Sequence, residues 1–300
     1  MITGQKPIKK SKQGRFQILD VVSMMQPITK YAHQMASSDN IPSRVREAFR
    51  IAEEEKPGAA HVELPEDIAD EYTYSRPVPR STVRRPTADV KSIAQAVAAL
   101  EQARRPVLVI GAGANRKMTS KMLGEFVEKT GIPFLTTQLG KGVIDERHPR
   151  FLGCAALSSG DFVHRAIEDA DCIVNIGHDV IEKPPFFMHN DGTRDADANR
   201  RVVIHVSTKT AEVDPVYFPH IEVIGDIANA MWQIKEAIAP SAKWNFDAML
   251  GYRQAELDHT EKLAADERFP IFPPHLVQQG RDALPSDAIV CLDNGVYKLW

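Results

Sequence analysis

The stretch RPVLVIGAGANRKMTSKMLGEFVEKTGIPFLTTQLGKGV (Arg105–Val143) decides the fold. Pro106–Ile110 is a short run rich in β-branched residues, and Gly111–Ala114 ends it. From Lys117 to Thr130 the apolar residues recur at helical spacing and a glycine follows as a C-terminal stop. Ile132–Leu135 is strand-like again. The stretch is therefore predicted to form a βαβ unit of a parallel sheet, whose strand ends carry a ligand.

A dinucleotide fingerprint is the first interpretation of the two glycines, and the sequence departs from it twice. The third glycine of G-x-G-x-x-G would fall at Arg116. No acidic residue ends the second strand, which runs into Thr136, Thr137 and Gln138. These departures disfavour an NAD-dependent dehydrogenase and leave two alternatives, a ligand-lined crevice or a tight turn without a ligand.

Length and composition describe an ordinary globular protein. The chain has 300 residues, 43% of them hydrophobic and 26% charged, with a net charge of −3, which suits one large or two ordinary domains and favours neither nucleic acid nor an anionic membrane as partner. No segment approaches the ~18 consecutive apolar residues of a membrane span, and no signal peptide is expected. We expect a cytoplasmic protein whose cysteines, Cys154, Cys172 and Cys291, are buried reduced thiols.

The rest of the chain is predicted to place one complete domain between two partial ones. Residues 88–240 are expected to form a doubly wound parallel sheet of five or six strands, after a linker at 76–87 rich in proline and arginine. Residues 1–75 are an α/β fragment too small to close its own core. A helical connector at 241–274 leads to 275–300, where a further domain begins with a buried strand at Ala288–Leu292.

Strand ends provide the candidate site. Gly111–Ala114 and Thr136–Gln138 end two neighbouring strands, and Gly177 and Gly225 end two others. Glycine permits a close backbone approach, while the threonine and glutamine side chains offer hydrogen bonds to a nucleotide or phosphate. The ten histidines show no metal-ligand spacing, so no metal site is predicted from them.

The order of segments resembles the thiamine-diphosphate-dependent enzymes of the acetolactate synthase family over nearly the whole chain. No single mark is decisive, but together they occur in the family's order. The marks are ITGQKP (Ile2–Pro7), FQ (Phe16-Gln17), PITK (Pro27–Lys30), PGAAHVELPEDI (Pro57–Ile68), RPVLVIGAGA (Arg105–Ala114), GIPFLTTQLGKGVIDERHPRFLG (Gly131–Gly153), ADCIVNIG (Ala170–Gly177), GD (Gly225-Asp226) and LDNGVYKLW (Leu292–Trp300).

This resemblance implies a three-domain plan, of which the chain covers a part. Residues 1–75 would be the C-terminal part of the pyrimidine-binding domain, 88–240 the whole Rossmann-like central domain, and 275–300 the start of the diphosphate-binding domain. The fold class is thus α/β, with partial thiamine-diphosphate-binding domains flanking the central one. The family's ylid-forming glutamate and its Mg²⁺-binding GDG…N motif would lie outside the chain, so the isolated chain is expected to be inactive.

The resemblance also implies the chemistry of the parent enzyme. It would be a transferase or lyase that decarboxylates a 2-keto acid and joins two pyruvates into acetolactate and CO₂, with thiamine diphosphate and Mg²⁺, in branched-chain amino-acid biosynthesis. The parent would be a homodimer or tetramer, with no nucleic acid or membrane as partner. A related 2-keto acid decarboxylase and a non-catalytic nucleotide-binding, FAD-binding or oligomerisation module are the alternatives.

Site residues follow position by position from the resemblance. Lys30 matches a lysine that lines the substrate approach. The expected cofactor-binding positions are Gly111, Gly113, Thr136, Thr137, Gln138, Gly177, Gly225, Asp226 and Gly295. The first five fall where the family holds FAD, but His178 follows Gly177 where the family has an arginine-containing motif. FAD-bound and FAD-free crevices therefore remain alternatives, and no metal ligand is assigned.

Overall fold

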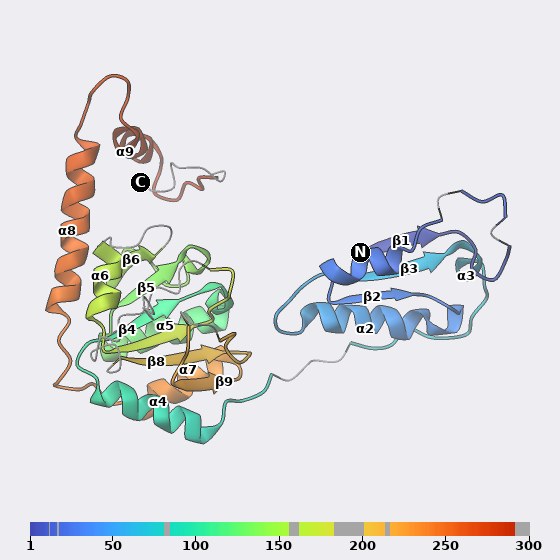
Figure 1. Cartoon of the computed structure of the whole chain (residues 1–300), viewed down its shortest axis with the longest axis horizontal. Helices are drawn as coiled ribbons and strands as arrows, with labels where there is room; N and C mark the ends of the chain where they lie inside the picture. Colours follow the sequence, from blue (N-terminus) through green and yellow to red (C-terminus); the bar gives the residue numbers. More distant parts are fainter. Residues whose placement is uncertain are drawn as a thin grey trace. The chain divides into compact units, whose positions relative to one another are not determined.

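The computed structural model (Figure 1) describes residues 1–11, 13–16, 18–80, 85–155, 162–182, 201–213 and 217–291. The chain divides into two compact units. We call Met1–Arg85 the N-terminal unit and Pro86–Trp300 the C-terminal unit.

The N-terminal unit is built on a small parallel sheet. Its strands are β1 (Ile2–Gln5), β2 (Tyr31–Gln34) and β3 (Ala60–Pro65), in the order β1-β3-β2. The helices and 3₁₀ turns of the unit are α1 (Val21–Met25), η1 (Gln26–Ile28), η2 (Ser38–Asn40), α2 (Ile41–Glu53) and α3 (Glu66–Ala69). Four buried apolar side chains form its core, which are Met35, Ala48, Val62 and Ile68.

Two of these strands, β1 and β2, are not apparent from the sequence. Each has four residues and lies at an edge of the sheet, with side chains that are exposed or half-buried. A half-exposed edge strand needs no continuous apolar run, so neither segment stands out by hydrophobicity. The α/β character expected of residues 1–75 is confirmed by the helix α2 and the strand β3.

The C-terminal unit contains the doubly wound sheet that the sequence predicts. Six parallel strands lie in the order β6-β5-β4-β7-β8-β9, so the chain starts at a central strand and extends the sheet first to one side and then to the other (Figure 1). The strands are β4 (Pro106–Ile110), β5 (Phe134–Thr137), β6 (Phe151–Ala155), β7 (Cys172–Ile176), β8 (Val202–Ser207) and β9 (Ile221–Ile224). This is an α/β fold.

Two groups of helices pack on this sheet. In the first, α4 (Val90–Gln102) and α5 (Lys117–Thr130) both contact α7 (Ile227–Ala237). In the second, α6 (Phe162–Asp169) and α8 (Asp247–Ala264) contact each other and β6. Every residue of β4 and of β7 is buried, as expected of strands covered on both faces.

The end of the described chain corrects two expectations. The helix α9 (Pro273–Ala283) is present, but residues 288–291 of the strand expected at Ala288–Leu292 form no strand, and Ile289 is 91% exposed. An apolar run becomes a strand only where a neighbouring strand accepts its hydrogen bonds. The prediction that Cys291 is buried is therefore also wrong, whereas Cys172 is buried and Cys154 is half-buried.

Candidate functional site

The carboxyl ends of three neighbouring strands bring four of the expected site residues together. At the last residue of β4, Ile110 pairs with Thr136 of β5 on one side and with Ile176 of β7 on the other. The segments that follow these strands therefore meet at one edge of the sheet. They include Gly111, Gly113, Thr137 and Gly177 among the residues expected to bind a cofactor.

Two of these glycines allow a direct backbone contact between the ends of β4 and β7. The Gly113 N–H donates to the Gly177 carbonyl at 2.8 Å. Gly177 has φ 65°, in the left-handed region, and a Cβ at this position would lie 2.4 Å from the Ala114 nitrogen. Glycine is required here both by its conformation and by the space.

A side chain that sequence reasoning missed lies in the middle of this edge. Glu182 is 4% exposed although it comes only a few residues after β7. Its Oε1 accepts hydrogen bonds from the Ala112 N–H, at 2.9 Å, and from the Thr137 hydroxyl. Its Oε2 accepts from the Asp179 N–H at 2.8 Å. One carboxylate thus joins the segments that follow three strands.

The environment of Glu182 acts on its charge in two opposing ways. Burial raises the pKa of the Glu182 carboxyl above its ordinary value, and this effect is the largest. The hydrogen bonds from Thr137, Asp179 and Ala112 favour the ionised form and lower the pKa. A glutamate in a loop belongs to no motif, so only the packed structure identifies it.

Crevice residues do not fit the diphosphate of FAD. A dinucleotide crevice presents free backbone N–H groups of the glycine turn to the diphosphate. Here every backbone N–H from Gly111 to Arg116 donates to an acceptor within the chain. The acceptor for Ala112 is the Glu182 carboxylate, which carries the same kind of charge as a phosphate.

The other expected positions have different surroundings. Gln138 begins the 3₁₀ turn η4 (Gln138–Gly140) and is exposed, while Thr136 is fully buried and pairs with Cys154 of β6. Gly225 and Asp226 follow β9, which β7 and β8 separate from β4, and the Asp226 carboxylate caps α7 by accepting from the Asn229 N–H at 2.9 Å.

The two positions outside the central sheet are Lys30 and Gly295. The Lys30 Nζ donates to the carbonyls of Ile51 and Glu54, at 2.6 and 2.8 Å. These carbonyls lie at the C-terminal end of α2, where a cation is favourable. Gly295 lies outside the described residues.

A second buried carboxylate, Glu63, lies in the N-terminal unit and was also missed. Glu63 of β3 is 0% exposed. Gln5 of β1 donates its side-chain amide to Glu63 Oε1 at 2.9 Å, and Gln34 of β2 donates to Oε2. Through these two carboxamides the Glu63 carboxylate joins all three strands of the sheet.

A buried relay of hydrogen bonds links β7 and β8. The Lys209 carbonyl can only accept, so the His205 Nε2, 3.1 Å away, carries the proton and His205 Nδ1 is the acceptor. The Tyr217 hydroxyl donates to this Nδ1 at 2.8 Å and accepts from the Asn175 side-chain amide at 2.9 Å. The neutral form of His205 is therefore the one that completes the relay.

We expect the stability of the C-terminal unit to depend on pH through His205. Burial lowers the pKa of His205 below its ordinary value of 6.5, so the unfolded chain binds the proton more readily. The contribution of His205 is present above pH 6.5 and is lost as pH falls through the pKa of the folded state. Urea unfolding followed at about pH 7.5 and about pH 5 should show a smaller pH-dependent loss in His205→Gln than in the wild type. The control is His259→Gln, in which an exposed histidine is replaced and the pH-dependent loss should equal that of the wild type. Equal losses in His205→Gln and the wild type would contradict the expectation.

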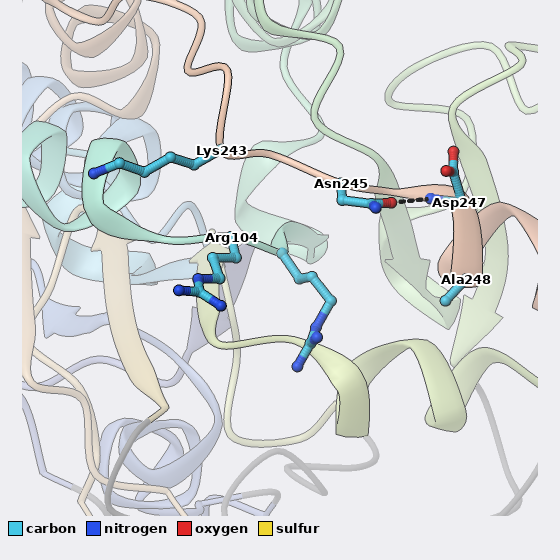
Figure 2. A pocket seen from close by; sticks show the side chains of 6 residues that line it. Arg104, Lys243, Asn245, Asp247 and Ala248 are labelled. Atoms are coloured by element: carbon cyan, nitrogen blue, oxygen red, sulfur yellow. Dashed lines mark hydrogen bonds between the residues drawn. The ribbon is translucent and has the colours of Figure 1, made fainter.

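A basic pocket lies near the start of β4 (Figure 2). It is lined by Arg104, Arg105, Lys243, Asn245, Asp247 and Ala248. In Figure 2 the labelled side chains of Lys243 and Arg104 do not point at a common centre, and Asn245 accepts from the Asp247 N–H at 3.0 Å. The pocket is at the amino end of β4, away from the strand ends that hold ligands in sheets of this kind.

Two further properties concern the described residues alone. Within the ranges that the structure describes, no group of three or more His, Cys, Asp or Glu residues is arranged to hold a metal ion. The described helices also include none that is both long and apolar enough to cross a membrane.

Comparison with known protein families matches the centre of the chain. Residues 93–234 match the family model "Thiamine pyrophosphate enzyme, central domain". The match contains all six strands of the doubly wound sheet.

Curated relatives match the chain over nearly its whole length. An acetolactate synthase of Bacillus subtilis (strain 168) is 29% identical over 95% of this chain and 49% of its own length. A catabolic acetolactate synthase of Raoultella terrigena is 30% identical over 95% of this chain and 50% of its own length. The chain spans about half the length of the curated relatives it matches.

Among solved structures, the chain is similar to one described as a thiamin diphosphate-dependent enzyme from Mycobacterium smegmatis. The TM-score is 0.67 at 20% identity, over 80% of this chain and 46% of that one. At this identity the likeness supports the fold alone.

Proposed function

We infer the function from one premise: the chain is similar to the acetolactate synthases, and residues 93–234 match the thiamine pyrophosphate enzyme central domain. We propose that the chain is about half of a thiamine-diphosphate-dependent enzyme that decarboxylates a 2-keto acid such as pyruvate and forms acetolactate. The match to acetolactate synthases over 95% of the chain is the observation that carries this proposal.

The domain organisation of the proposal follows the sequence. Residues 1–75 would be the C-terminal part of a pyrimidine-binding domain, joined by a linker at 76–87 to the central domain at 88–240. A connector at 241–274 would lead to the start of a diphosphate-binding domain at 275–300. The division of the chain after Arg85 and the family match over 93–234 support this arrangement.

Thiamine diphosphate, when bound, supplies the electron sink for decarboxylation. Among the described residues, no group of three or more His, Cys, Asp or Glu is arranged to hold Mg²⁺. Gly295, the proposed contact to the diphosphate, lies outside the described residues. We therefore assign no reaction step to a residue of this chain, and Lys30 remains a proposed residue of the substrate approach.

We propose the wider setting from the family resemblance of the sequence. The parent enzyme would use Mg²⁺, form a homodimer or tetramer, and act in the cytoplasm in branched-chain amino-acid biosynthesis. FAD is left out of this proposal, because the backbone N–H groups of the crevice that would hold it already donate to acceptors within the chain.

We expect the isolated 300-residue chain to form no acetolactate. The relatives are about twice as long, so the chain would lack part of the cofactor site. Purified chain with pyruvate, thiamine diphosphate and Mg²⁺ should stay at background in assays for acetolactate and acetaldehyde. Product above background would contradict the expectation.

A companion experiment tests the reaction itself. The DNA on both sides of the reading frame would be sequenced, and any longer in-frame polypeptide expressed and assayed in the same way. Acetolactate formation by the longer chain supports the proposal. A longer chain that binds thiamine diphosphate and leaves pyruvate unchanged would count against acetolactate as its product.

A further inference from the structure

The glycine turn after β4 has no backbone donor left for a ligand. The N–H groups of Gly111 and Gly113 donate to the carbonyls of Ile176 and Gly177, both at 2.8 Å. Those of Ala114 and the next two residues donate to carbonyls inside the turn itself. The remaining group, the Ala112 N–H, donates to Glu182.

Three donors converge on Glu182 from the ends of adjacent strands. They are the Ala112 N–H after β4, the Thr137 hydroxyl at the end of β5, and the Asp179 N–H after β7. The Thr137 oxygen is itself held by the Gly140 N–H at 3.1 Å. Convergent donors at the carboxyl ends of β4 and its neighbours are the arrangement with which an open α/β sheet holds a ligand's phosphate.

We propose that Glu182 is a built-in occupant of the phosphate position in this crevice, and that it excludes the diphosphate of FAD or of another dinucleotide. The bound anion is supplied by the chain itself. Glu182 is thus a specificity-determining residue of the central domain. This inference rests on the geometry of the C-terminal unit and stands independently of the proposed function.

Space and charge both support the exclusion. A Cβ at Gly111 would lie 2.6 Å from Glu182 Oε2, so the carboxylate is packed directly against the turn. At Gly113 a Cβ would lie 3.0 Å from the Gly177 Cα, which closes the other side. A phosphate at this place would compete with the Glu182 carboxylate for the same three donors, and negative charge on that carboxylate would repel it across a poorly solvated contact.

The first test uses the wild-type chain. FAD, ADP and sodium formate would each be titrated while thermal unfolding is followed by tryptophan fluorescence, with sodium chloride at equal ionic strength as control. Trp232 and Trp244 lie in the described part of the C-terminal unit and the N-terminal unit has no tryptophan, so the signal reports on the C-terminal unit. We expect no saturable rise in Tm with any of the three and no flavin retained after gel filtration.

The second test removes the occupant. We expect Glu182→Ala to lower Tm by on the order of 5 °C, because three donors lose their acceptor. Formate fits the space of the lost carboxylate and should restore about 3 °C in a saturable manner, whereas chloride should not. Glu182→Gln replaces one acceptor oxygen by an NH₂ donor, so the variant should be destabilised. Because it keeps the side-chain volume, it leaves no space for formate and should not be rescued by it.

A matched control and the opposing outcomes complete the design. Glu128→Ala removes an exposed glutamate of α5 and should leave both Tm and the response to formate unchanged. A saturable uptake of FAD or ADP by the wild type overturns the proposal, and so does a Glu182→Ala variant that responds equally to formate and chloride. If Glu182→Ala does not fold, the wild-type titrations and the Tm of Glu182→Gln test the proposal instead. A Glu182→Gln variant with the Tm of the wild type overturns the proposal. Neither test measures acetolactate, so failure here is distinct from failure of the proposed function.

Discussion

Gly177→Ala is expected to destabilise the C-terminal unit by about 3–5 kcal/mol, through left-handed strain together with overpacking. The added Cβ would lie 2.4 Å from the Ala114 nitrogen and 2.7 Å from the Gly113 carbonyl carbon, both of them backbone atoms. Backbone cannot rotate away as a side chain can, so the ends of β4 and β7 would have to separate. Urea unfolding followed by tryptophan fluorescence measures the loss.

Gly142→Ala is the matched control for this prediction. Gly142 has φ 78°, close to the 65° of Gly177, but no atom lies within 4 Å of its added Cβ. The stability of Gly142→Ala should fall only by the cost of the left-handed conformation, about 1 kcal/mol. Equal losses in the two variants would show that the close approach of the two strands contributes nothing.

Glu63→Ala is expected to have the second large effect, a loss of about 2–4 kcal/mol in the N-terminal unit. The substitution leaves the amides of Gln5 and Gln34 without their common acceptor inside the sheet. Among the described residues of this unit, the core cluster contains four buried apolar residues, so a loss of this size is expected to open it. Hydrogen exchange should show lost protection in β1, β2 and β3, with the strands of the C-terminal unit still protected.

The exposed Glu66 provides the control for Glu63. Its carboxylate pairs with the Lys6 Nζ at 2.9 Å, and its side chain is 53% exposed. A surface pair of this kind contributes little, so Glu66→Ala should keep normal protection in β3. Unchanged protection in Glu63→Ala would contradict the assigned role of the buried carboxylate.

The central sheet could be predicted from the sequence because its strands are buried on both faces. Such strands are continuous apolar runs, and β4, in which every residue is buried, begins and ends where the sequence places it. The helix α5 also has its expected bounds, since its apolar residues recur at helical spacing and Gly131, with φ 68°, ends it.

The features that the sequence did not predict depend on contacts between distant parts of the chain. Ile289 belongs to an apolar run but is exposed, because apolar character does not by itself provide a partner strand. Glu182 and Glu63 are buried carboxylates whose partners come from other strands, so neither has a local sequence signal. Lys30, assigned from a resemblance, has its ammonium group at carbonyls of α2 that lie far along the chain.

The strand order of the C-terminal unit has a consequence for synthesis on the ribosome. The strand β4 emerges first, and β5 can pair with it early through the short connection by α5. The partner on its other edge is β7, in which Cys172 pairs with Pro106. At a synthesis rate of ~5–20 residues per second, this edge of β4 stays unpaired for several seconds until β7 has been synthesised. During that interval an apolar strand edge is open to pairing with other nascent chains. We therefore expect crowded expression to trap aggregates at this stage, and slower initiation to increase the yield of folded protein.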